Sequence, residues 1–298
     1  MKSSFFKLSA AGCFIVILVM ACKRDLDKTN PSYPTLESYF KNSTELQKGT
    51  NAVYAIFHGG ALVGREWFFL NDLRSDEVAA GGGQLEVPRN QILIGATTAD
   101  NSVMNNVWNG LYTVIHRANT VIVNGPTVTD NAAARDRSVA EAKFLRGWAY
   151  YELVSMWGPV PFYTKPVASA TDFQPRTATD QIYTQIITDL KDAAAVLLPA
   201  YTGADLGRVT KGAANALLGR VYMQKGDYAS AKTALLDVYN SGQYELNSVP
   251  YTNNFLEETE FNKESIWEAV FSENVTNSFN WGYQGDLSGG SSQGTVRN

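Results

Sequence analysis

Hydrophobic residues recur at every third or fourth position along much of the chain, which is the spacing of one face of an α-helix. This pattern predicts helices over residues 102–123, 138–157 and 179–198. The triplet Asn124-Gly125-Pro126 is expected to end the first helix. Gly125 would adopt a left-handed conformation there, and Pro126 cannot continue a helix.

Residues 212–243 carry the most specific internal pattern of the chain. They match successive positions of the tetratricopeptide repeat, a helix–turn–helix unit of about 34 residues. The matching positions are Leu218, Gly219, Tyr222, Gly226, Tyr228, Ala231 and Leu235, whereas Asn215 stands where the repeat usually has tryptophan. We expect Gly219 and Ala231 to lie where the two helices touch. Tyr222 and Tyr228 are expected to fill the groove around that contact.

Together these segments predict a mainly α fold, a tetratricopeptide-like helical repeat scaffold with long irregular loops and a few short strands. Residues 264–271 (ESIWEAVF) lack a helical period and are rich in β-forming side chains, so we expect a strand there. Residues 274–298 are rich in Asn, Ser and Gly and predict a long surface loop. Because the chain stops inside this loop, we expect that more polypeptide belongs after residue 298.

The first 22 residues have the pattern of an export signal. Lys2 and Lys7 give a basic start, and the apolar run that follows is shorter than the roughly 20 residues of a membrane span. The residues Val19-Met20-Ala21-Cys22 resemble a bacterial lipobox. We therefore expect Cys22 to be acylated and to become the first residue of the mature chain. The alternatives are an uncleaved anchor and an ordinary signal peptide with a chance cysteine.

The chain accordingly divides into three predicted parts. Residues 1–21 form a lipoprotein signal peptide, residues 22–35 a tether, and residues 36–298 the folded domain. The tether is polar and contains two prolines, which is typical of a linker. Acyl chains on Cys22 would hold the domain on the surface of a membrane.

Composition narrows the chemistry that this chain can perform. It has 29 acidic and 25 basic residues, a formal net charge of −4 and a pI near 5.3, which argues against a nucleic-acid partner. Its two histidines, His58 and His116, are far apart, and its two cysteines, Cys13 and Cys22, lie in the first 22 residues. None has the spacing of a zinc site. We therefore expect no metal site, no disulfide and no cofactor.

Several motifs follow one another along the chain. They are the lipobox with KRDLDKTNP after it, residues 72–77 (DLRSDE), residues 108–119 (WNGLYTVIHRAN), residues 141–163 (EAKFLRGWAYYELVSMWGPVPFY), and the repeat over residues 209–228. Taken in this order they resemble the SusD/RagB family, the surface nutrient-binding lipoproteins of Bacteroidetes, and residues 141–163 are the most specific of them.

This resemblance implies a helical repeat scaffold that carries aromatic-rich loops. In the family such loops bind oligosaccharides, or peptides in some members, and the protein covers a SusC-like TonB-dependent transporter. The resemblance therefore implies an outer-membrane lipoprotein on the cell surface that catalyses nothing. Members are usually longer than 298 residues. On this ground the chain is expected to be the N-terminal, SusD-like portion of such a protein, truncated at its C-terminus.

Two segments without helical spacing supply candidate ligand residues. Sugar recognition uses aromatic faces together with planar polar side chains. Between Trp67 and Asn101 we expect a loop in which Asp76 and Arg89 bind sugar hydroxyls, although the two could instead form an ion pair. Trp67 itself is expected to be core.

The second segment is residues 279–283 (FNWGY), where Trp281 and Tyr283 are expected to stack against a sugar ring. By contrast, Trp108, Trp148 and Trp157 belong to predicted helices and are expected to be core residues.

Two other classes of function stay open on the sequence alone. Residues 290–294 (GSSQG) match a nucleophile elbow, but neither an acid nor a histidine follows Ser292, so the motif predicts no hydrolase. Acidic pairs such as Glu257 and Glu258 could serve a glycan-processing enzyme only in a suitable geometry. The tetratricopeptide pattern also fits an adaptor lipoprotein that binds a protein partner.

Overall fold

The computed structural model of this protein describes residues 39–80 and 85–270. The chain divides into two units, residues 1–41 and residues 42–298, and only residues 39–41 of the first unit are described. Within those residues the rings of Tyr39 and Phe40 meet edge to face, with centroids 5.1 Å apart. The second unit contains the helices and strands from α4 onward.

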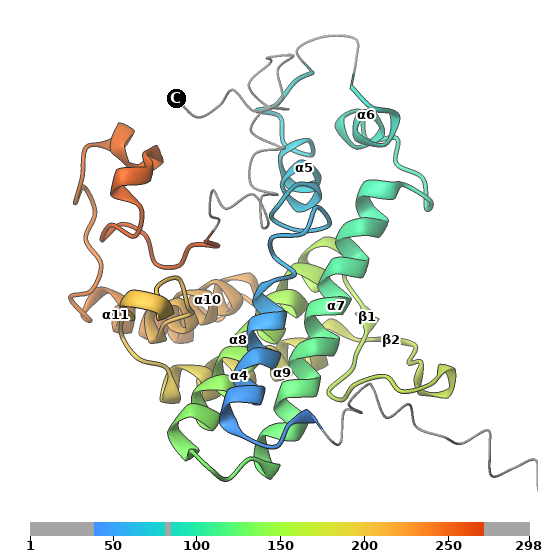
Figure 1. Cartoon of the computed structure of the whole chain (residues 1–298). Coiled ribbons are helices and arrows are strands. Elements are labelled where there is room, and N and C mark those ends of the chain that lie inside the picture. The colour runs from blue at the N-terminus through green and yellow to red at the C-terminus, as the bar shows by residue number, and fades with distance from the viewer. Residues whose placement is uncertain (1–38, 81–84, 271–298) are drawn as a thin grey trace, which may run out of the picture. The chain divides into compact units, whose positions relative to one another are not determined.

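Six long helices build the described part of the second unit. They are α4 (Ser43–Tyr54), α7 (Ser102–Asn124), α8 (Ala132–Trp157), α9 (Thr179–Val196), α10 (Lys211–Gln224) and α11 (Tyr228–Tyr239). From α7 to α11 each helix packs on the next along the chain, and α4 packs on both α7 and α8 (Figure 1). Such neighbour-on-neighbour packing is the arrangement of helical repeat proteins. The predicted mainly α, tetratricopeptide-like fold is confirmed.

Five of these helices begin at a residue whose side chain accepts a backbone hydrogen bond from the first turn. These residues are Asn42, Asn101, Asn131, Thr210 and Asp227, which cap α4, α7, α8, α10 and α11. A side chain of this kind satisfies an N–H group that has no partner within the helix. Local chemistry therefore marks where each of these helices starts.

The three long helices expected from the spacing are present, but the left-handed conformation expected for Gly125 was wrong. Gly125 has φ −49°, and the chain continues from α7 into a short 3-10 turn, η1 (Gly125–Thr127). A Cβ atom on this residue would lie only 2.4 Å from Cγ2 of Val139 on α8. Glycine is needed there for the close packing of η1 on α8 rather than for a left-handed turn.

The helices α10 and α11 form the predicted repeat. A Cβ atom on Gly219 would lie 2.5 Å from Cδ2 of Leu235, and Ala231 is buried, so the helices meet at the expected positions. Tyr222 is buried as expected, but Tyr228 is 70% exposed and does not fill the groove. Tyr228 is the first residue of α11, and its side chain lies mostly in solvent rather than between the helices.

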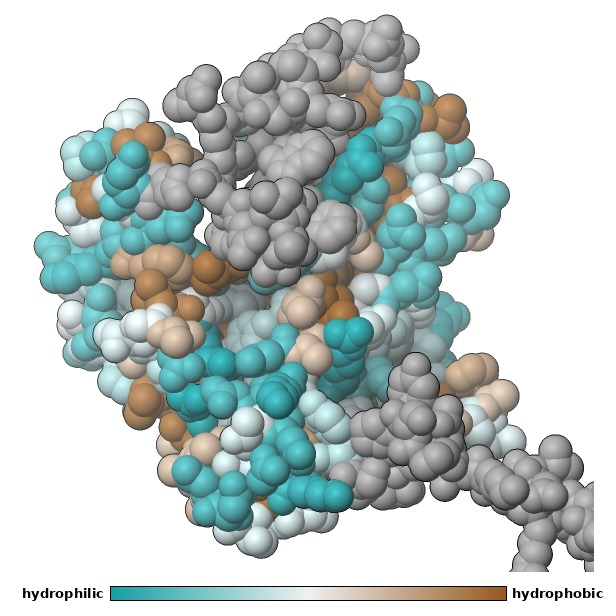
Figure 2. Space-filling view, in the orientation of Figure 1, coloured by the Kyte–Doolittle hydropathy of each residue, from teal (hydrophilic) through white to brown (hydrophobic). Residues whose placement is uncertain are grey.

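Shorter elements connect the long helices or follow α11. They are α5 (Glu66–Asp72), α6 (Val87–Leu93), η2 (Ala170–Asp172), η3 (Gly203–Asp205), η4 (Tyr251–Phe255), η5 (Glu257–Thr259) and the antiparallel pair β1 (Val160–Pro161) and β2 (Arg176–Thr177). Figure 2 shows hydrophobic surface at α6, where Val87 and Ile94 are exposed.

The strand expected over residues 264–271 is wrong for the part that is described, since residues 264–270 are irregular. Trp267 holds this segment in place. Its Nε1 donates to the carbonyl of Gly207 at 3.0 Å, and its ring packs edge to face on Phe57 and Phe144. Aromatic packing, not a β-ladder, fixes the backbone there.

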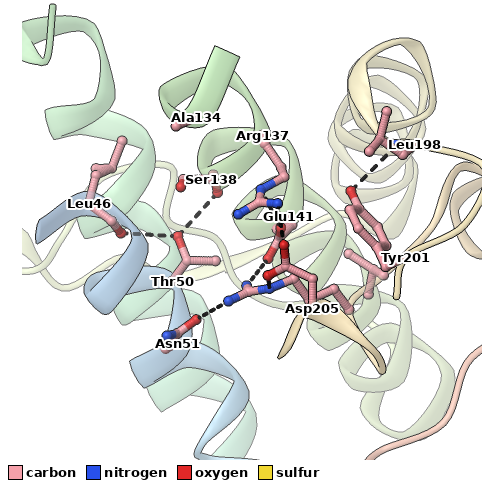
Figure 3. A network of polar contacts seen from close by, with 12 residues as sticks. Leu46, Thr50, Asn51, Ala134, Arg137, Ser138, Glu141, Leu198, Tyr201 and Asp205 are labelled. Atoms are coloured by element: carbon pink, nitrogen blue, oxygen red, sulfur yellow. Dashed lines mark hydrogen bonds and ion pairs between the residues drawn. The ribbon is translucent and has the colours of Figure 1, made fainter. Parts of the chain in front are cut away.

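A polar network joins α4 and α8 to the segment that follows η3. Arg208 donates to Glu141 at 2.7 Å, to Asp205 at 2.6 Å and to Asn51 at 2.8 Å. Arg137 donates to Asp205 at 2.8 Å. Figure 3 shows these acidic and amide side chains converging on one centre between the helices.

Candidate functional site

An open groove lies between α7 and the segment that carries β1 and β2. Figure 1 shows this segment beside α7, and the groove has a volume of about 560 Å³. Four aromatic side chains line it: Trp108 and Tyr112 from α7, and Tyr163 and Phe173 from the β1–β2 segment. Polar side chains, including Asn109, His116 and Lys165, share the same walls.

Helical spacing sets the first wall of the groove. Trp108, Tyr112 and His116 follow one another at intervals of four residues, so they lie on one face of α7. The ring centroids of Trp108 and Tyr112 are 5.0 Å apart, and those of Tyr112 and Tyr163 are 6.1 Å apart. Phe173 is 68% exposed. The groove thus offers a row of aromatic rings that solvent can reach.

Hydrogen bonds from the helices hold the second wall. The hydroxyl of Tyr112 donates to the carbonyl of Pro161 at 2.7 Å. The hydroxyl of Tyr150 donates to the carbonyl of Tyr163 at 2.9 Å and accepts from its N–H at 2.6 Å. Burial raises the pKa of Tyr112 and of Tyr150, so both stay protonated and keep donating. A strand pair of only two residues a side gains its fixed position in this way.

A buried charged group supports the same wall from behind. Two nitrogens of Arg146 bind the two carboxylate oxygens of Asp189 at 2.8 and 2.7 Å, and a third donates to Oδ1 of Asn119 at 2.7 Å. Nδ2 of Asn119 in turn donates to the carbonyls of Tyr163 and Lys165 at 3.0 and 3.2 Å. Because each partner is fixed by the one before, the backbone that presents Tyr163 and Lys165 is rigid.

This arrangement suits a flat, partly apolar ligand with hydroxyl groups. Aromatic rings stack against the C–H faces of such a ligand, and amide or charged side chains bind its polar edges. Throughout residues 39–80 and 85–270, no group of three or more His, Cys, Asp or Glu side chains is arranged to hold a metal ion.

The structure places Asp76 and Arg89 differently from the open loop that we expected. Arg89 lies on α6 and is buried, and its guanidinium pairs with Glu66 at 3.1 Å and with Glu86 at 2.7 Å. It also covers the ring of Phe69 at 4.3 Å from the centroid. Asp76 is exposed after α5 and is not the partner of Arg89. The expected loop over residues 67–101 was wrong, because α5 and α6 occupy it; the ligand role of both residues stays a prediction.

Several predicted residues lie outside the described part of the chain. These are the lipidation site Cys22, the stacking pair Trp281 and Tyr283, and the motif at residues 290–294.

The tryptophans expected in the core divide into two groups. Trp148 is buried, as predicted, whereas Trp108 and Trp157 are half-buried at the edge of the helices. Trp108 lines the groove, and its ring lies 5.3 Å from that of Trp157. The groove residues Tyr112, Tyr163, Lys165 and Phe173 were not among the predicted site residues either. The sequence did contain a signal for this site: Trp108, Tyr112 and His116 are spaced by four residues, which places them on one helix face beside the apolar stripe.

Trp67, which was expected in the core, is half-buried and binds a buried carboxylate. Its Nε1 donates to Glu152 at 2.9 Å. Burial raises the pKa of Glu152 above its ordinary value of 4.5, and the bond from Trp67 lowers it by less. The unfolded chain therefore releases this proton at a lower pH than the folded chain does. As a result, folding stability is lost as the pH rises from about 4.5 toward the pKa of the folded state.

We expect Glu152→Gln to remove this loss, because a glutamine oxygen can still accept from Trp67 without carrying a buried charge. The variant should gain stability over the wild type as the pH rises, by at most about 1.4 kcal/mol for each pH unit. Urea unfolding between pH 4.5 and 8 measures this difference. A difference between the two proteins that does not change with pH would contradict the prediction.

This chain thus combines a helical repeat array with an accessible aromatic groove. Residues 26–223 match the family described as "SusD-like_3: Starch-binding associating with outer membrane". Because the match covers more than half of the sequence, the chain belongs to this SusD-like family. The resemblance seen in the motifs is thereby confirmed.

Individual relatives agree with this assignment. SusD-like protein P25 of Formosa agariphila is 25% identical over 91% of this chain and 53% of its own length. A SusD-like protein of Bacteroides ovatus is 26% identical over 73% of this chain and 39% of its own length. This chain thus spans about half the length of the curated relatives that it matches.

Solved structures show the same fold. A laminarin-binding SusD-like protein is 28% identical, with a TM-score of 0.66 over 76% of this chain and 51% of the other. Surface glycan-binding protein A from Bacteroides fluxus is 25% identical, with a TM-score of 0.68 over 76% of this chain and 50% of the other. Among the helices of the described ranges, none is long and apolar enough to cross a membrane.

Proposed function

We propose that this protein is a lipid-anchored, glycan-binding protein of the outer membrane that passes oligosaccharide to a SusC-like TonB-dependent transporter. The observation that carries the proposal is the family match over residues 26–223, because the family is described as starch-binding and as associating with the outer membrane. The names of the solved relatives, laminarin-binding and glycan-binding, support a glycan ligand. The proposal assigns binding and no catalytic step.

The groove on α7 supports the proposal from the residues upward. It combines accessible aromatic rings with polar side chains, as a sugar site requires. In this proposal Trp281 and Tyr283 add further stacking faces, and Asp76 adds a partner for hydroxyl groups. We include the transporter because the sequence motifs resemble those of the SusD/RagB family, whose members work with such a transporter.

Binding of the purified chain to a glycan array, followed by calorimetric titration, tests the first half of the proposal. A stacking ring contributes about 1 to 2 kcal/mol, so we expect Phe173→Ala or Trp281→Ala to weaken binding about 5- to 30-fold. Both variants should keep the melting temperature of the wild type. Trp148→Ala is the matched control, since it removes a buried ring and should lower the melting temperature instead. Binding unchanged in folded Phe173→Ala would exclude the groove as the site.

The anchor and the partner are tested in cells. Cys22→Ala should move the protein from the membrane fraction to the soluble fraction, because the acyl chains that hold it on the bilayer are lost. From detergent-solubilised membranes, the wild type should co-purify with a TonB-dependent barrel. A Cys22→Ala protein that stays in the membrane fraction, beside a wild type that takes up no labelled fatty acid, would rule out the lipid anchor.

A further inference from the structure

The elements that form the groove carry a charge opposite to that of the whole chain. Residues 102–124 and 158–178 contain three basic side chains, Arg117, Lys165 and Arg176, and one acidic side chain, Asp172. The whole chain has a formal net charge of −4. A local excess of positive charge on an acidic protein attracts anionic ligands to that place.

Lys165 puts one of these charges on the wall of the groove itself. Its side chain is exposed, and no carboxylate in residues 39–80 and 85–270 forms an ion pair with it. Its carbonyl accepts from Asn119 at 3.2 Å, and Pro166 follows it, so the backbone that carries the ammonium group is held in place. Only the ordering of the lysine side chain itself then costs entropy when the ammonium binds a ligand.

Asp172, the acidic residue of these elements, binds backbone N–H groups outside the groove lining. Oδ2 of Asp172 accepts from the N–H groups of Ala168 and Ser169, both at 2.9 Å, and so caps η2. The residues that line the groove include neither Asp nor Glu. Lys165 and the imidazole of His116 therefore face a groove whose walls carry no negative side chain.

We infer that the groove between α7 and the β1–β2 segment binds an oligosaccharide that contains uronic acid, with Lys165 pairing with the sugar carboxylate while the aromatic rings stack on the sugar faces. This inference rests on the proposed function and names the class of glycan.

A carboxylate suits these walls better than a sulfate ester. The lining contains one ammonium group and no guanidinium. The strength of a single charge-assisted hydrogen bond increases with the basicity of its acceptor, and a carboxylate is more basic than a sulfate ester. The hydroxyl of Thr113 cannot add a donor, since it already donates to the carbonyl of Asn109 at 2.7 Å.

Calorimetric titration of the whole purified chain with a panel of trisaccharides tests the inference. The panel contains galacturonate, mannuronate and guluronate trisaccharides, the uncharged counterpart of each with its carboxyl groups reduced, and sulfated forms of those counterparts. At low salt we expect at least one uronate to bind about 5- to 15-fold more tightly than its uncharged counterpart. This advantage should shrink at 0.5 M salt, roughly as screening of an exposed ion pair predicts.

Lys165→Gln should weaken binding of the uronate about 5- to 15-fold and leave the uncharged trisaccharide unaffected. Lys232→Gln is the matched control, because Lys232 is an exposed lysine on α11, away from the groove. This control should bind every trisaccharide as the wild type does. Phe173→Ala should weaken the charged and uncharged trisaccharides alike.

The outcomes separate this inference from the proposed function. If uncharged or sulfated glycans bind best, or if Lys165→Gln affects all trisaccharides equally, the uronate inference is overturned while glycan binding stands. If neither the panel nor the array contains a ligand, the proposed function fails, and the inference fails with it.

Discussion

Replacement of Arg146 by methionine is expected to lower the free energy of unfolding by about 3–5 kcal/mol. The side chains of Arg146 and Asp189 are 4% and 1% exposed, and their guanidinium and carboxylate groups form two hydrogen bonds between α8 and α9. Without the arginine, the carboxylate of Asp189 stays buried with no cation beside it. Chemical denaturation of the wild type and the variant measures the loss.

The same two helices provide the control. Lys143 on α8 pairs with Asp192 on α9 at 2.6 Å, but their side chains are 24% and 49% exposed. Lys143→Met should cost less than about 1 kcal/mol, because water solvates the carboxylate that remains. The double variant Arg146→Met/Asp189→Leu should recover most of the loss, since apolar side chains replace both charges. Equal losses in Arg146→Met and Lys143→Met would contradict this account.

The loss of Arg146 should also weaken ligand binding in the groove. Arg146 donates to Oδ1 of Asn119, and Nδ2 of Asn119 donates to the carbonyls of Tyr163 and Lys165. A variant that still folds should therefore bind glycan more weakly than the wild type, because the wall with Tyr163 and Lys165 is less rigid. Lys143→Met, which does not contact this wall, should bind as the wild type does.

Replacement of Arg208 by methionine is the second change with a large expected effect, again about 3–4 kcal/mol at neutral pH. Arg208 is the close partner of Glu141, whose side chain is 1% exposed. After the change, Arg137 still lies beside Glu141, but its Nε is 3.6 Å from Oε1. Asp205 and Asn51 lose a donor at the same centre (Figure 3).

The pH dependence of this variant has a definite sign. Burial already raises the pKa of Glu141, and the charge of Arg208 opposes that rise. Without Arg208 the pKa in the folded state rises further, so the folded variant favours the protonated carboxyl. The loss should be largest at neutral pH and should shrink as the pH falls toward 4.5, the ordinary value for this group.

Urea unfolding at pH 7 and pH 5 measures this trend. Lys263→Met is the control, because Lys263 and Glu245 form an exposed pair at 3.4 Å and should contribute little at either pH. A loss in Arg208→Met that is the same at both pH values would show that Glu141 does not carry the effect.

The helical scaffold and the family could both be predicted from the sequence alone. The helices α7 and α9 appear where hydrophobic spacing predicts them, whereas α8 ends as predicted but begins at Ala132 rather than at residue 138. Side chains such as Asn101 and Asn131 cap the first turns of α7 and α8. The hairpin of α10 and α11 follows from the repeat around Gly219. These features depend on residues within one or two helical turns of each other, so their signal is contained in a short stretch of sequence.

The tertiary structure decided the features that join distant residues. Spacing could not show that Arg89 pairs with Glu66 rather than with Asp76, nor that Val139 excludes a side chain at Gly125. Trp108 from α7 and Phe173 from a segment far along the chain also line one groove. Such pairings arise when helices pack and bury charges that need partners, and a local pattern does not specify which partner comes within reach.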